Sequence, residues 1–124
     1  MRLLLDTHIL LWWLADSLRL SRSARVAIRD ADTAYVSTAS VWEIGIKTAL
    51  RKLDFRGDIE EEISGNQFST LAITIPHAAA AARLPHHHSD PFDRMLVAQA
   101  RIESLTLITG DAALQRYEVP VFLA

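Results

Sequence analysis

Residues 90–111, which read DPFDRMLVAQARIESLTLITGD, indicate the fold class more clearly than any other stretch. We expect Asp90 to be the N-cap of a helix and Pro91 to be its first residue, because both residue types are typical of helix starts. The pattern predicts a helix over Pro91–Glu103, followed directly by a buried strand over Leu105–Thr109. A helix that leads into a short aliphatic strand is the repeating unit of α/β proteins.

The same alternation extends over the rest of the chain. Further short runs rich in aliphatic or β-branched residues predict strands at Leu3–Leu5, Ala34–Ser37, Leu71–Ile75 and Val119–Leu123. The segments between them predict helices at Thr7–Ala15, Ser21–Asp30, Ala39–Leu53, Asp58–Ser64 and His77–Leu84, and a short turn at Ala112–Tyr117. Such strands suit burial on both faces, so we predict an α/β fold with a mostly parallel sheet. Pro120 places the last strand at an edge.

Composition narrows the class of protein. The 124 residues correspond to one domain, since domains average roughly 150 residues, and we assign residues 1–124 to it. The chain has no cysteine, which excludes a disulfide framework and cysteine-ligated metal sites. It has no apolar run near the ~20 residues of a membrane span and no secretory leader, so we expect a cytoplasmic protein without a membrane partner. The net charge of −2 means that nucleic-acid binding would need a local basic patch.

Four acids follow the predicted strands or open a helix. Asp6 directly follows the first strand, Glu43 lies about one turn into the helix after the second, and Asp111 lies two residues beyond the fourth. The carboxyl ends of parallel strands meet at one edge of a sheet, where ligands bind, so these three acids should face the same crevice. Asp93 joins them if the start of its helix reaches that crevice.

Four carboxylates in one crevice repel each other, and a bound cation would make the cluster tolerable. Oxygen ligands without sulfur favour Mg²⁺ or Mn²⁺. Each acid also has a simpler interpretation. Asp6 and Asp111 suit helix caps or turns, Glu43 suits an exposed helix surface, and Asp93 suits the positive end of a helix dipole. Only their joint placement favours a metal site; we assign Asp90 mainly to capping and keep it as a reserve acid.

Four segments resemble motifs of the PIN-domain ribonucleases, in the order of that family. They are LLLDTH at residues 3–8, SVWEI at 40–44, HSDPFDRMLVAQA at 88–100 and LITGD at 107–111. The third segment is close to the signature of the bacterial VapC-type toxins and is specific; the first and last would be weak alone. Together they extend from residue 3 to residue 111, nearly the whole chain.

The resemblance implies a three-layer α/β/α sandwich with a five-stranded parallel sheet. It implies a Mg²⁺- or Mn²⁺-dependent endoribonuclease, in which Asp6, Glu43 and Asp93 bind the metal and Asp111 is the fourth acid. Thr7 and Thr109 would be hydroxyl donors beside the metal. The expected reaction is attack of metal-activated water on an RNA phosphodiester. The resemblance also implies a homodimer and a cognate antitoxin protein whose tail enters the active-site groove.

The sequence leaves the roles of the basic residues and histidines open. Lys47 lies four residues after Glu43, on the same helix face, so it could contact an RNA phosphate or pair with Glu43. Arg94, beside Asp93, is a second candidate for phosphate contact. We interpret four other arginines as a solvated helix face: Arg19, Arg22, Arg25 and Arg29. The run His86–His88 lacks the spacing of a structural zinc site and is interpreted as a loop leading into the Asp90 cap.

Two other functions compete with RNA cleavage by a toxin. One is a phosphatase or phosphotransfer domain with Asp6 as nucleophile. That chemistry usually wants a second Asp two residues later, where this chain has His8, and a Lys near the fourth strand's end, where residues 109–113 have none. The other is a binding module that keeps the fold without catalysis. The intact set of four acids argues against it.

Overall fold

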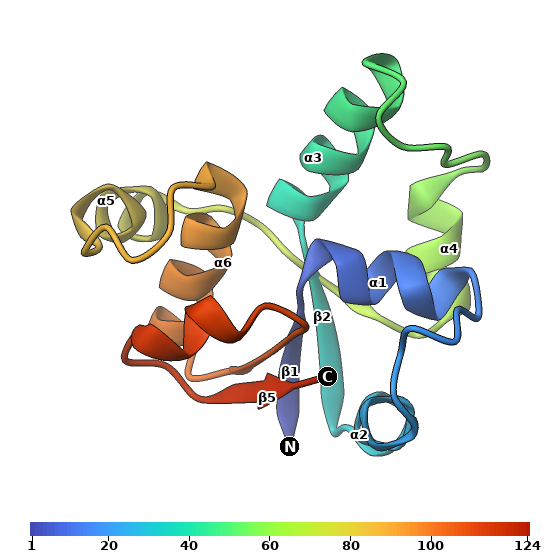
Figure 1. Cartoon of the computed structure of the whole chain (residues 1–124), viewed down its shortest axis with the longest axis horizontal. Helices are drawn as coiled ribbons and strands as arrows, with labels where there is room; N and C mark the ends of the chain where they lie inside the picture. Colours follow the sequence, from blue (N-terminus) through green and yellow to red (C-terminus); the bar gives the residue numbers. More distant parts are fainter.

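The computed structural model describes residues 1–124, in which helices alternate with strands (Figure 1). The strands are β1 (Arg2–Leu5), β2 (Thr33–Ser37), β3 (Ser69–Leu71), β4 (Thr106–Thr109) and β5 (Val121–Leu123). The helices are α1 (Thr7–Leu14), α2 (Arg22–Asp30), α3 (Thr38–Ala49), α4 (Ile59–Gly65), α5 (Ile75–Arg83), α6 (Pro91–Ile102) and the 3₁₀ helix η1 (Ala112–Arg116). No helix has the length and apolar character needed to cross a bilayer.

All five strands pair in parallel, in the order β3-β2-β1-β4-β5. The expected five-stranded parallel sheet is therefore confirmed. β5 lies at an edge, as Pro120 predicted, and the proline immediately precedes the strand. The order changes direction at β1, whose neighbours are β2 and β4. The carboxyl end of β1 is thus the topological switch point where α/β sheets bind ligands.

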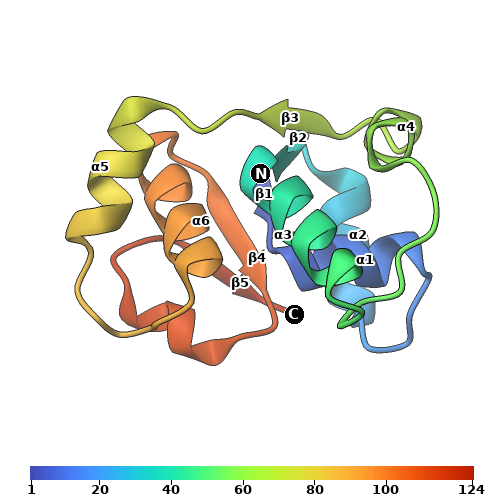
Figure 2. The same cartoon turned by 90° about the horizontal axis from the view of Figure 1, so that it is seen from above.

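Helices cover both faces of the sheet, which gives the expected three layers. In Figures 1 and 2, α5 and α6 lie on one side of the sheet, and α1, α2 and α4 lie on the other. Successive residues of β1 point to opposite faces, so Leu3 and Leu5 join one buried cluster and Leu4 joins the other. This two-sided burial explains why β1 is an uninterrupted leucine run.

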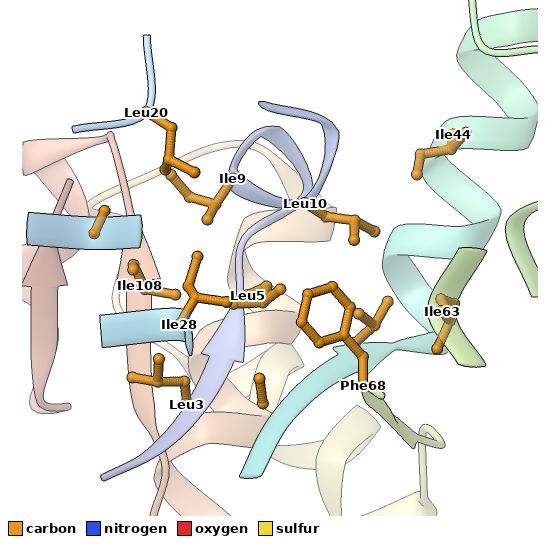
Figure 3. Close-up of a cluster of buried hydrophobic side chains, with 13 residues drawn as sticks. Leu3, Leu5, Ile9, Leu10, Leu20, Ile28, Ile44, Ile63, Phe68 and Ile108 are labelled. Carbon is orange, nitrogen blue, oxygen red and sulfur yellow. The ribbon is translucent and has the colours of Figure 1, made fainter. Parts of the chain in front are cut away.

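The larger cluster holds α1 and its neighbours against the sheet. Figure 3 shows this cluster: the ring of Phe68, just before β3, lies beside Leu5, and Leu10 of α1 and Ile44 of α3 lie above them. These side chains are almost completely buried, and each contributes about 1.5–3 kcal/mol by leaving water. The packing fixes α1 and α3 relative to β1, and both helices carry residues of the candidate site.

Two predicted boundaries are wrong. The third strand spans Ser69–Leu71 rather than Leu71–Ile75, because Thr74 caps α5 and makes a reciprocal capping box with His77, which places Ile75 in the helix. The helix predicted over Ala39–Leu53 ends at Ala49, and Arg51 adopts a left-handed φ of 58°. The remaining helix predictions agree with the structure to within one or two residues, including Asp90 as the N-cap of α6.

Candidate active site

Asp6 begins the site at the carboxyl end of β1. Its Oδ1 accepts a hydrogen bond from the backbone N–H of His8 and caps α1, while Oδ2 accepts one from the Thr109 hydroxyl at 2.6 Å. Burial raises the pKa of Asp6, and these two hydrogen bonds oppose the rise. The cap and the site interpretations are therefore compatible, because each uses a different oxygen.

Glu43 lies on α3 and is only 2% exposed. Its Oε2 accepts a hydrogen bond from the Lys47 ammonium one turn later, and this bond raises the pKa of Lys47. Its Oε1 is buried and has no hydrogen-bond partner. The interpretation of Glu43 as an exposed helical residue is wrong. A buried carboxylate oxygen without a donor is costly, and it is a position where a cation would be stabilised.

Asp93 lies in the first turn of α6. The negative charges of Asp6 and Glu43 both raise its pKa. Burial is the largest cause, followed by the charges of Asp6 and Asp90, and together they raise the pKa of Asp93 to about 7. Asp90 itself accepts from the backbone N–H groups of Phe92 and Asp93 as the helix cap. The start of α6 therefore lies at the same cavity as Asp6 at the carboxyl end of β1, the step that sequence spacing left open.

Asp111 completes the group from the turn after β4. Its Oδ1 caps η1 through the N–H of Ala113, and its Oδ2 lies 2.8 Å from Nε2 of His88. Partial burial works against ionisation, but the Ala113 and His88 hydrogen bonds and the charge of His88 outweigh it and lower the pKa of Asp111. Asp111 thus ionises more readily than Asp6 and Asp93, whose pKa values are raised.

His88 is a site residue that sequence reasoning missed. Its Nδ1 accepts the backbone N–H of Asp90 at 3.0 Å, so in the neutral ring the proton is on Nε2. That N–H donates to Asp111 and lies 3.5 Å from an Asp93 oxygen. His88, Asp93 and Asp111 come close enough for one ion, but a protonated Nε2 cannot be a ligand. We therefore assign His88 to holding the carboxylates.

The side chains surround a cavity of about 460 Å³. Its lining includes Asp6, Asp93 and Asp111, together with His8 and Trp12 of α1. Glu43 and Lys47 line a second cavity of about 240 Å³ that shares His8 with the first. The four predicted acids thus lie in two cavities that meet at the start of α1, and the charge of Glu43 acts on both Asp6 and Asp93.

Two other predicted residues donate their side-chain hydrogen bonds to groups other than the four acids, although Thr7 lines the Glu43 cavity. The Thr7 hydroxyl donates to Ser40 at 2.8 Å and ties α1 to α3 instead of contacting an acid. Arg94 is 9% exposed and does not face the crevice. Its guanidinium donates to the carbonyls of Ala81, Leu84, Pro85 and His88. The expected phosphate contact by Arg94 is therefore wrong, and Arg94 fixes the loop that carries His88.

The donor set fits a hard divalent cation. All four acids offer oxygen, which Mg²⁺ and Mn²⁺ prefer. Glu43 has a buried oxygen that accepts no hydrogen bond. Burial and the nearby carboxylates disfavour the charged form of Asp93. A bound cation would stabilise both the unpartnered oxygen of Glu43 and the charged form of Asp93. Thr109 would support such a site from outside by holding Asp6.

Comparison with known proteins gives a consistent result. The PIN domain profile matches residues 3–120. Ribonuclease VapC22 of Mycobacterium tuberculosis (strain ATCC 25618 / H37Rv) is 33% identical over 125 residues, which cover 94% of this chain and 92% of that protein. The fold is similar to that of FitAcB from Neisseria gonorrhoeae, with a TM-score of 0.70, 21% identity and coverage of 97% and 96% of the two chains.

Two further structures share the fold at lower identity. VapBC2 from Rickettsia felis, solved bound to a DNA fragment from its promoter, has a TM-score of 0.69 at 13% identity and covers 99% of this chain and 98% of its own. A toxin–antitoxin complex from Klebsiella pneumoniae has a TM-score of 0.68 at 18% identity, with coverage of 96% and 94%.

Proposed function

The chain belongs to the PIN-domain family, among its VapC-type ribonuclease toxins, and on that premise we propose that it is a metal-dependent endoribonuclease. The observation that carries the metal dependence is the buried Oε1 of Glu43, which has no hydrogen-bond partner, while the charge of Glu43 acts on both Asp6 and Asp93. A domain that had lost its metal would be more stable with an apolar residue in place of Glu43. The non-catalytic binding module is therefore the weaker candidate.

Asp6, Glu43 and Asp93 would hold Mg²⁺ or Mn²⁺, with Asp111 as the fourth acid, directly or through water. Such an ion, when bound, lowers the pKa of water and stabilises the charge that develops on a phosphodiester. The chain's own groups keep the acids in place. Thr109 orients Asp6, and His88 orients Asp111.

Lys47 would have two roles. In the metal-free protein its ammonium neutralises Glu43 from one turn away. Its side chain is 34% exposed, so it can turn toward solvent once a cation takes over that neutralisation. Lys47 is then available to contact an RNA phosphate, as its position on the Glu43 face of the helix indicates.

The phosphotransfer alternative fits the geometry poorly. A nucleophilic Asp6 would need a free carboxylate oxygen exposed to the substrate. Asp6 is only 4% exposed, and both of its oxygens already accept hydrogen bonds, from His8 and Thr109. These contacts suit a carboxylate that binds an ion from a fixed position better than one that attacks phosphorus.

We also propose an antitoxin protein and a second copy of the chain as partners. A cavity of about 660 Å³ lies between α1 and residues 53–56 and shares His8, Trp12 and Arg19 with the acid cavity. It is suited to an antitoxin tail that would reach the site. The homodimer is supported by Ile75, which is 84% exposed beside the edge strand β3, and by Ile73 at 38%.

The direct test is cleavage of a total cellular RNA pool by the purified protein, with Mg²⁺, with Mn²⁺ and with EDTA. Asp93→Asn and Asp32→Asn are prepared identically; Asp32 is an exposed acid that pairs with the N-terminus, remote from the site. We expect discrete fragments from the wild type and from Asp32→Asn that disappear with EDTA and with Asp93→Asn. Cleavage by Asp93→Asn at the wild-type rate would reject the proposal.

A further inference from the structure

Helix α1 carries an aromatic pair beside the acid cavity that the proposed hydrolysis does not use. His8 and Trp12 are four residues apart, so they lie on the same helix face. Their ring centroids are 6.3 Å apart with an interplanar angle of 46°. The His8 side chain is 64% exposed, and Trp12 is half-buried. Both line the cavity that holds Asp6, Asp93 and Asp111.

The position of Trp12 depends on a glycine at the other side of the cavity. A Cβ added to Gly110 would lie 3.3 Å from Cη2 of Trp12, closer than ordinary van der Waals contact. The absence of a side chain at Gly110 therefore lets the indole lie against the turn between β4 and Asp111. The indole lies against this turn and lines the cavity that also holds Asp6, Asp93 and Asp111.

Arg19 adds a positive charge to the same cavity. It is exposed, and its guanidinium makes no ion pair or side-chain hydrogen bond within the fold. In contrast, Arg25 pairs with Asp16 and Arg29 pairs with Asp30. The interpretation of these arginines as one solvated face thus does not extend to Arg19, which precedes α2 and lies at the acids. Its charge is available to a ligand.

We propose that Trp12 stacks on an unpaired nucleobase of the RNA substrate and that Arg19 binds a phosphate of the same strand. This inference rests on the proposed function for the position of the scissile phosphate at the acids. Aromatic side chains stack on splayed, single-stranded bases, and guanidinium groups bind phosphates. The cavity of about 460 Å³ falls within the usual ~300–1,000 Å³ of small-ligand sites. The structure thus assigns Trp12 and Arg19 to a subsite for one unpaired base and its phosphate, next to the cleavage point.

The test compares two fluorescent probes by anisotropy: a randomised octaribonucleotide and a ribose-phosphate octamer of equal charge without bases. Ca²⁺ replaces Mg²⁺, and a gel verifies that the probes stay intact. We expect Trp12→Leu to weaken binding of the base-bearing probe about 5- to 150-fold, the range for stacking of one base. Binding of the base-free probe should stay within about twofold, which also shows that the variant is folded.

Two control variants, at Trp12 and Tyr35, and one variant that tests the role of Arg19 complete the experiment. Trp12→Phe should keep most of the preference for bases, since it keeps a ring. Tyr35→Leu removes a half-buried ring of β2 that lies near Arg2 at the amino end of β1, whereas Asp6 follows the carboxyl end of that strand, and it should change neither affinity. Arg19→Met should weaken both probes equally. If Trp12→Leu weakens both probes alike, or neither, the inference is rejected.

RNA cleavage, measured separately, keeps the two proposals apart. A wild type that prefers bases through Trp12 but does not cut RNA would reject the nuclease and leave the nucleobase subsite. A wild type that cuts RNA, with no effect of Trp12→Leu on the preference for bases, would reject the subsite alone.

Discussion

The Thr109 hydroxyl donates a 2.6 Å hydrogen bond to Oδ2 of Asp6 and so joins the carboxyl ends of β4 and β1 across 103 residues of sequence. The backbone of Asp6 reinforces the link, because its N–H donates to the carbonyl of Ile108. Asp6 is held on three sides, by the sheet, by the first turn of α1 and by Thr109. The acid cluster is thus a product of sheet register as much as of sequence motifs.

Thr109→Val should weaken divalent-cation binding about 10- to 100-fold, the usual cost of removing a group that holds a metal ligand. Valine has the shape of threonine but leaves Asp6 Oδ2 without its donor. Binding of Mn²⁺ is measured by the EPR signal of the free ion. Thr106→Val, at the other end of the same strand, is the matched control and should bind Mn²⁺ as the wild type does.

Lys47→Met should destabilise the metal-free protein by about 1–3 kcal/mol, because it leaves the buried carboxylate of Glu43 without its donor. Saturating Mg²⁺ should recover most of this loss. Urea denaturation with and without Mg²⁺ measures both effects. An equal loss of stability in both conditions would show that Glu43 does not contact the ion.

Asp93 should make the metal-free protein less stable as the pH rises. Its folded pKa of about 7 exceeds the ordinary aspartate value of 3.8, so the native state binds more protons than the unfolded state between these values. The stabilisation is complete below about pH 4 and is lost as the pH passes through 7, at up to 1.36 kcal/mol per pH unit, or about 4 kcal/mol at most. Thermal unfolding from pH 4 to 8 measures the slope.

Asp93→Asn should flatten that dependence and stabilise the metal-free protein at pH 8, because the amide cannot ionise. Bound Mg²⁺ should also reduce the slope, since the ion competes with the proton for Asp93. A wild type and an Asp93→Asn variant with parallel stability curves would show that Asp93 does not titrate in this range.

Arg94→Met should cost about 2–4 kcal/mol of stability, because four carbonyls around the His88 loop each lose the hydrogen bond that Arg94 donates. It should leave the salt dependence of RNA binding unchanged. Arg19→Met should behave in the opposite way, with unchanged stability and a salt slope reduced by about one unit. The reverse assignment of the two effects would contradict the structural role given to Arg94.

Most of the fold could be predicted because apolar runs, caps and prolines all pointed to the same elements. Asp90 with Pro91 located α6, and the leucine run located β1. The third strand was misplaced because Ile73 and Ile75 have high β propensity, whereas the Thr74–His77 capping box makes residue 75 helical. The early end of α3 has no glycine or proline to mark it.

The acids of the site could be located because parallel strands bring their carboxyl ends together. The hydrogen-bond partner of an acid's second oxygen could not be predicted, because it comes from elsewhere in the chain: Thr109 for Asp6 and His88 for Asp111. Arg94 was misassigned because it is adjacent to Asp93 in sequence. Adjacent helical residues do not face the same way, and that signal could have separated them.

The most direct test measures Mn²⁺ binding and RNA cleavage on the same samples across one Mn²⁺ titration. The account predicts that the cleavage rate follows the occupancy of the site, and that Glu43→Gln and Asp93→Asn lose both together while Asp32→Asn loses neither. Full cleavage at Mn²⁺ concentrations that leave the site empty would contradict the account.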